Sequence, residues 1–138
     1  MILITKIQPQ DVGRRIRLEG IILSKENIEP ILQKGTFKCQ SCLRVSEVEE
    51  KTSTPYPPEV CIECGGKTFE LLPNESEFTE KQILQLQIIS REEPLQVILY
   101  DSLCSESYTT GTPLLLEGTL RVAFDTPNYY YVDVEEIL

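Results

Sequence analysis

The chain has 138 residues, of which 41% are hydrophobic and 25% charged, a size and balance that fit one globular domain, or one domain with a small insert. No apolar run reaches the roughly 18 residues of a membrane-spanning helix, and no secretory cleavage site follows the N-terminus, so we expect no membrane partner. The net charge is −9, and residues 71–138 carry three Lys or Arg against twelve Asp or Glu. A general nucleic-acid binder is excluded, because polyanion binding rests largely on Lys and Arg replacing counterions.

The predicted strands show either alternation of polar and apolar side chains or short apolar runs. The first begins at Arg15 with charged and apolar residues in alternation, and the second leads directly into Cys39. Residues 101–108 are expected to form a single helical turn, and residues 125–128 a turn. In chain order, the strands are expected at 15–23, 30–38, 68–72, 82–89, 95–100, 113–124 and 129–134.

This order of elements predicts an all-β protein, because no helical pattern of ten or more residues occurs. About five substantial strands with long mid-chain connections fit a five-stranded Greek-key barrel of the OB type. We expect the barrel to comprise residues 1–38 and 67–138, with a module of residues 39–66 inserted into it. A β-sandwich is the alternative architecture.

Two cysteine pairs give the strongest chemical signal, Cys39-x2-Cys42 and Cys61-x2-Cys64. Their separation lies within the range of about 15–20 residues seen in zinc ribbons, and four thiolates complete a tetrahedron with no open position. We therefore predict one structural Zn²⁺, which replaces a core that residues 39–66 are too polar to build. A single iron in a rubredoxin-like electron carrier and a site without metal are the alternatives.

The remaining sequence predicts no catalytic site and no small-molecule substrate. The chain has five cysteines and no histidine, so the fifth cysteine, Cys104, has no histidine to activate it and is expected to be a buried or half-buried free thiol. An odd cysteine count with paired metal spacing also favours a reducing, intracellular compartment. Gly65-Gly66-Lys67-Thr68 lacks the first glycine of a Walker A loop, since Cys61 occupies that position.

A nucleic-acid interface is suggested by charge and aromatic residues together. Arg15 and Arg17 share one face of the first strand, and Arg14 and Lys25 lie near them in the sequence. OB folds bind single strands with a basic groove and stacking rings. The opposing interpretation is that the arginines are solvent-facing edge charges and that the aromatics belong to the core. The candidate stacking rings are Phe37, Tyr100, Phe124 and Tyr129-Tyr130-Tyr131.

Taken in order, these motifs resemble the N-terminal region of the minichromosome maintenance (MCM) replicative helicases. The opening string Val12-Gly13-Arg14-Arg15-Ile16-Arg17-Leu18-Glu19-Gly20-Ile21-Ile22 is similar to the family's first OB strand. The cysteine pairs follow in the family's order, and the resemblance covers the chain from about residue 12. The later motifs are Phe69-x-Leu71, Ser76-x-Phe78-x3-Gln82, Val97-Ile98-Leu99-x2-Ser102-Leu103, Gly111 and Glu117-Gly118-Thr119-Leu120-Arg121-Val122.

The resemblance implies an OB barrel with an inserted zinc ribbon that binds single-stranded DNA and supports ring assembly. It implies Zn²⁺ on the four paired cysteines, and as partners other copies of the chain or MCM-type replication proteins. It places a DNA-facing hairpin at residues 122–131. With no ATPase module in the chain, this region is expected to be non-catalytic. The expected DNA contacts are Arg14, Arg17, Lys25, Lys81, Arg121 and Tyr129.

Several departures from the family pattern predict weaker DNA binding than in a typical member. The hairpin segment 123–129 contains no Lys or Arg, and Ile83 and Gln85 stand where basic residues are expected. The helical subdomain that usually precedes the barrel is also not seen. The alternative function is a zinc-stabilised adaptor with little DNA affinity. An archaeal source is favoured by this compact form, with a cytoplasmic location if archaeal and a nuclear one if eukaryotic.

Overall fold

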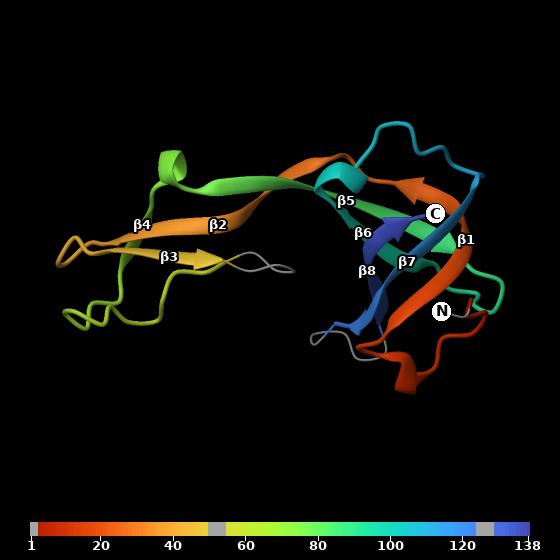
Figure 1. Cartoon of the computed structure of the whole chain (residues 1–138), viewed down its shortest axis with the longest axis horizontal. Coiled ribbons are helices and arrows are strands. Elements are labelled where there is room, and N and C mark those ends of the chain that lie inside the picture. Colours follow the sequence, from red (N-terminus) through yellow and green to blue (C-terminus); the bar gives the residue numbers. More distant parts are fainter. Residues whose placement is uncertain (1–2, 50–54, 124–128) are drawn as a thin grey trace. The chain divides into compact units, whose positions relative to one another are not determined.

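The structure is a computed structural model that describes residues 3–49, 55–123 and 129–138 (Figure 1). The chain divides into two compact units. The first comprises Met1–Glu29 and Glu80–Leu138, and the second is Pro30–Thr79. The helices of the described segments are short 3-10 turns, at Pro9–Asp11, Pro73–Glu75 and Asp101–Leu103, and none of them is long and apolar enough to cross a membrane.

The first unit is a closed five-stranded barrel. Its strands are β1 (Arg15–Lys25), β5 (Glu77–Gln87), β6 (Leu95–Tyr100), β7 (Pro113–Val122) and β8 (Tyr130–Ile137). The pairings β1–β5, β5–β6, β6–β8, β8–β7 and β7–β1 close the ring, and only β6–β8 is parallel. Figure 1 shows these strands wrapped around one another. The predicted OB-type Greek-key barrel is therefore confirmed.

Alternating side chains of the five strands fill the barrel. In β5 the residues Leu84 and Leu86 are fully buried, while Ile83 and Gln85 between them face outward and are half-buried. This period of two is the signature of a strand with one face on the core. The core consists of Ile16, Leu18, Ile22, Leu84, Leu86, Ile88, Leu95, Val97, Leu99, Leu114, Leu116, Leu120, Val132 and Val134.

Gly118 lies where β7 approaches β8 most closely. The register between these strands shifts between Glu117 and Gly118. A Cβ atom on Gly118 would lie 2.4 Å from the carbonyl oxygen of Asp133 and 2.9 Å from the Cα of Val134. Because both atoms belong to the backbone of the paired strand, no side chain can rotate to make room.

One buried amide fixes the connection that follows β6. Gln82 is 1% exposed and lies on the same inward face of β5 as Leu84 and Leu86. Its Nε2 donates to the carbonyl oxygens of Ser105 and Glu26, at 3.0 and 3.4 Å, and its Oε1 accepts from the Ser105 N–H at 2.9 Å. The amide is thereby satisfied, and it ties the segment after Asp101–Leu103 to the end of β1.

The second unit is built on the long strand β2 (Glu29–Cys39). β3 (Val45–Glu49) and β4 (Phe69–Leu71) pair antiparallel with it on opposite sides. Both Ser46 and Leu71 lie opposite Phe37, which is 5% exposed. Thr36 also anchors the chain after β4, because its hydroxyl donates to the Glu75 carbonyl oxygen at 2.8 Å.

Most strands were predicted to within a few residues, with four differences. β5 begins at Glu77, well before the predicted start at residue 82. The predicted strand at 30–38 is β2, which lies in the second unit and is not one of the five strands that close the barrel. β3 was not predicted, since none of its five residues is buried. β8 begins and ends slightly later than predicted. The predicted turn at 125–128 and Phe124 lie outside the described residues.

Candidate metal centre and nucleic-acid face

Each cysteine pair sits in a tight turn of the same construction. In the first turn, the Leu43 N–H donates to the Cys39 carbonyl at 2.9 Å; in the second, the Gly65 N–H donates to that of Cys61 at 2.8 Å. Leu43 and Gly65 both have positive φ, 67° and 74°. That backbone conformation turns the chain back immediately after the second cysteine of each pair.

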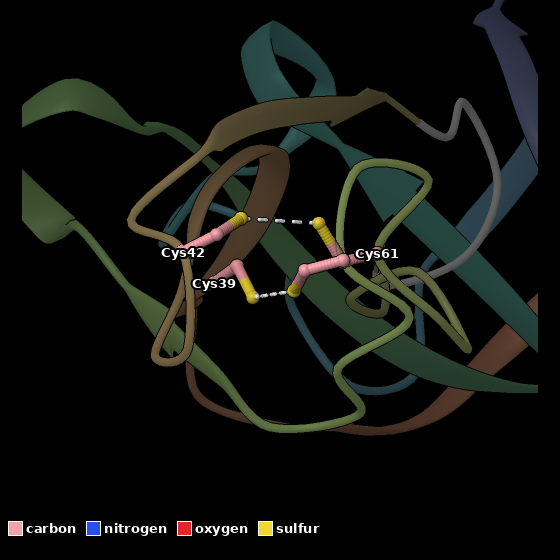
Figure 2. A group of neighbouring side chains, drawn as sticks. Cys39, Cys42 and Cys61 are labelled. Carbon is pink, nitrogen blue, oxygen red and sulfur yellow. Dashed lines mark hydrogen bonds between the residues drawn. The ribbon is translucent and has the colours of Figure 1, made fainter.

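The two turns bring the four sulfur atoms together. Cys39, Cys42, Cys61 and Cys64 have all their Sγ atoms within 4.8 Å of one another. The Sγ atoms of Cys39 and Cys64 are 3.6 Å apart and those of Cys42 and Cys61 are 3.5 Å apart. Figure 2 shows the labelled thiols pointing toward a common centre. The described residues thus form one four-cysteine cluster that could bind a metal ion.

The donor set and its spacing fit a tetrahedral metal. A metal with bonds of about 2.3 Å to four sulfurs separates the sulfurs by about 3.8 Å, close to the distances found here. Gly66 leaves room for the cluster, because a Cβ on it would lie 3.2 Å from the sulfurs of both Cys39 and Cys64. The Arg44 guanidinium, which follows the first turn, binds Glu63 of the second at 2.6 Å.

Backbone amides favour the thiolate form of two of the four cysteines, whereas burial and the neighbouring thiols raise the pKa of Cys42 and Cys64. The N–H groups of Cys42 and Ser41 lower the pKa of Cys39 to about 6. The pKa of Cys61 is lowered in the same way, first by the amide of Cys64. Thiolates are the metal-binding form of cysteine. Cys104 differs, since burial raises its pKa and its Sγ lies 3.5 Å from the Leu99 carbonyl oxygen.

The outer face of β5 and β6 combines a lysine, an aromatic ring and aliphatic side chains. The register places Lys81 opposite Tyr100 and Ile83 opposite Ile98, all half-buried. In OB folds, the face made by the second and third barrel strands and the loops after the first and fourth bind oligonucleotides. Here β5 and β6 are the second and third strands of the barrel, so this face is the candidate nucleic-acid surface.

Comparison with known proteins agrees with the fold. The family model for the MCM OB domain matches residues 3–123. The chain belongs to the MCM OB domain family. The chain is 29% identical to the DNA replication licensing factor MCM4 of Drosophila melanogaster over 100 residues, which are 68% of this chain and 12% of that protein.

An archaeal relative and a solved MCM structure cover more of the chain. The Minichromosome maintenance protein MCM of Saccharolobus solfataricus is 27% identical over 135 residues, or 88% of this chain and 20% of that protein. The crystal structure of the N-terminal domain of an archaeal MCM superposes with a TM-score of 0.80 at 24% identity, over 99% of this chain and 60% of that one. The chain thus spans a minor part of the length of its curated MCM relatives.

The six residues expected to contact DNA fall into two groups. Arg121 lies opposite Tyr131, and the Arg14 carbonyl accepts from the Leu120 N–H, which places both near the start of the β7–β8 connection. Arg17 follows on β1, and Tyr129 closes the connection by accepting from the Ala123 N–H at 3.0 Å. Half of the expected MCM hairpin, residues 124–128, lies outside the described segments. Lys25 and Lys81 form the second group, at the barrel end where β1 finishes and β5 enters.

Two of the residues expected to contact DNA, Arg17 and Arg121, form ion pairs with buried carboxylates. Nε and Nη2 of Arg17 donate to Glu117 Oε1 at 3.1 and 2.8 Å, and Nε of Arg121 donates to Asp133 Oδ2 at 2.5 Å. The side chains of Glu117 and Asp133 are only 9% and 8% exposed. Hydrogen bonds from Arg17 hold the pKa of Glu117 below its usual value, so the carboxylate stays ionised.

The other candidates differ in what they contact. Lys25 Nζ donates to the carbonyl oxygen of Glu106 at 2.6 Å, and the Tyr129 hydroxyl donates to Gln96 at 2.6 Å. Among the described residues, Lys81 and Arg14 make no ion pair. Sequence reasoning missed the roles of Glu117 and Asp133, because their partners, 100 and 12 residues away in the chain, are set by a strand register that no local pattern reveals.

Proposed function

We propose that this chain is the part of an MCM-type replication protein that binds single-stranded DNA and supports oligomer assembly, and that it holds one structural Zn²⁺. The observation that carries the proposal is an MCM-family OB barrel whose outer β5–β6 face presents a lysine, Lys81, beside an aromatic ring, Tyr100. A cation with a stackable ring is the combination that OB folds use for single strands.

The expected DNA path crosses β5 and β6 and continues toward the β7–β8 connection. Ile83 and Ile98 offer apolar contact to bases, while Gln85 and Gln96 lie opposite each other and offer neutral hydrogen bonds. Arg14 lies at the far end of this path. Since the path carries few cations, we expect modest affinity and a shallow salt dependence. No catalytic step is assigned to this region, and the other parts of MCM proteins are its natural partners.

The four-cysteine cluster supports zinc as the metal. Both zinc and iron accept four thiolates in a tetrahedron, but a role in holding the turns together needs no redox chemistry. A purified protein with one zinc per chain is colourless, whereas an iron tetrathiolate absorbs visible light. A visible absorption band that increases with the iron content would show that the cluster binds iron, and would favour an electron carrier.

Oligonucleotide binding tests the DNA proposal. Fluorescence anisotropy with a labelled single strand is measured at several salt concentrations on metal-loaded protein. We expect salt-sensitive binding, and we expect Lys81→Gln to weaken it and to reduce the slope of log K against log salt by about 0.7, the value for one phosphate contact on a single strand. Lys34→Gln is the matched control, because it removes the same charge from another half-buried lysine, which pairs with Glu47 in the second unit.

Two results would contradict this assignment. Equal losses for Lys81→Gln and Lys34→Gln would mean that only net charge matters and that the β5–β6 face is not the site. No binding of the wild type at low salt would favour the second candidate, an adaptor that binds proteins. The exposed apolar side chains around the cysteine turns support that candidate, notably Ile62 at 80% and Leu43 at 62% exposed.

A further inference from the structure

The outer face of β1, β7 and β8 carries a strip of arginines, each bound to carboxylates of the same barrel. Arg15 binds three of them: its Nη2 lies 3.1 Å from Glu117 and 3.5 Å from Glu136, and its Nη1 lies 2.8 Å from Glu135. Arg17 shares Glu117 from the other side, so both oxygens of that carboxylate are occupied.

The second part of the strip has the same construction. Asp133 accepts from Arg121 on one oxygen, and its other oxygen lies 3.4 Å from the Tyr100 hydroxyl. Burial, followed by the charge of Asp133, raises the pKa of Tyr100, so this hydroxyl remains a donor. Asp133 thus joins the arginine strip to the edge of the β5–β6 face.

The carboxylates lie beneath the arginines. Glu117 and Asp133 are nearly buried, whereas the side chains of Arg15, Arg17 and Arg121 are 44%, 37% and 39% exposed. A phosphate that approaches these guanidiniums therefore meets positive charges that the buried carboxylates already neutralise. With Glu135 and Glu136 added, three arginines face four carboxylates, so the strip has no excess positive charge to attract a polyanion.

We propose that Glu117 and Asp133 are specificity-determining residues that keep this arginine strip from binding phosphate and so confine single-stranded DNA to the β5–β6 face. The inference deepens the proposed DNA-binding function and rests on it. It predicts that removing the two buried negative charges creates phosphate binding on a surface where the wild-type chain has little.

The test is a gain of function. Glu117→Gln with Asp133→Asn keeps side-chain size and one accepting oxygen at each position, but removes two charges from beneath three arginines. We expect the double variant to bind a single-stranded oligonucleotide about tenfold more tightly at low salt. The slope of log K against log salt should steepen by about 1–2, since each freed arginine adds about 0.7. The control is Glu49→Gln with Glu70→Gln, which changes net charge equally at two exposed positions of the second unit, and should change affinity less than twofold.

A second pair of variants keeps the proposal falsifiable if the double variant folds poorly. In the wild-type background, Arg17→Gln should change affinity no more than Lys34→Gln, because Arg17 is already occupied. In the Glu117→Gln background, the same Arg17→Gln change should remove most of the gain, because Arg15 stays paired with Glu135 and Glu136.

Three results would overturn the masking proposal. They are a loss of affinity for Arg17→Gln well beyond that for Lys34→Gln in the wild-type background, a double variant that binds no better than its control, and a gain in the Glu117→Gln variant that removal of Arg17 does not reduce. Binding by the double variant alone, with none by the wild type, would support masking while contradicting the proposed DNA-binding function of the chain itself.

Discussion

Replacing Cys39 by serine is expected to abolish metal binding and to unfold the segment around the two cysteine turns. Cys39 is fully buried, and its sulfur is one of four that a tetrahedral metal requires. Apart from the sulfurs, only a few hydrogen bonds hold these turns, and several apolar side chains near them are exposed. Since the binding energy of a structural zinc, on the order of 10 kcal/mol, is largely folding energy, little native structure should survive in the turns.

The measurement combines metal content with a heteronuclear NMR spectrum of the full chain. We expect less than one tenth of a metal ion per chain, collapse of the signals from residues 39–66 toward random-coil positions, and barrel signals that remain dispersed. Cys104→Ser is the matched control, because Cys104 lies in the first unit outside the cluster, and it should keep one metal ion per chain. Loss of the barrel signals together with the turns would show that the barrel does not fold independently of the metal.

Replacing Gly118 by alanine is expected to destabilise the barrel strongly. The added methyl carbon would lie 2.4 Å from the Asp133 carbonyl oxygen and 2.8 Å from a methyl group of Val132. The β7–β8 pairing must therefore separate locally. Overpacking of this kind costs about 3 kcal/mol, which lowers the melting temperature of a domain of this size by on the order of 10 °C.

Gly20→Ala provides the graded control in the same barrel. Its added carbon would lie 3.0 Å from the Gln87 carbonyl oxygen and 3.1 Å from the Leu86 Cβ, so a shift of a few tenths of an ångström accommodates it. We expect a cost of about 1 kcal/mol. Thermal unfolding followed by circular dichroism compares the two variants. Equal melting temperatures for Gly118→Ala and Gly20→Ala would contradict the close approach of β7 and β8.

The features predicted from the sequence are those encoded locally. The cysteine cluster was predicted because each C-x2-C turn forms from adjacent residues. The barrel strands were predicted because a half-buried strand alternates, as Gln82 to Gln87 do. β3 was not predicted, because a strand without a buried residue has no hydrophobic pattern to detect. The place of residues 30–38 was misjudged because a strand pattern does not say which sheet the strand joins.

The ion pairs of the arginines on β1 could not be predicted from the sequence. Arg15 and Arg17 were correctly placed on one face of a strand, and Arg17 was expected to contact DNA. The structure places Glu117 against both of them. Charge counted along the chain could not reveal this neutralisation, because the partners come from β7 and depend on its register with β1.

An NMR titration of the ¹⁵N-labelled, metal-loaded chain with a short single-stranded oligonucleotide shows whether DNA binds the β5–β6 face. We expect chemical-shift changes concentrated at Lys81, Ile83, Ile98 and Tyr100, smaller changes near Arg14, and little change at Arg17 or in the cysteine turns. Changes confined to Pro30–Thr79, or centred on Arg17 and Glu117, would contradict the assignment of the β5–β6 face as the DNA-binding surface.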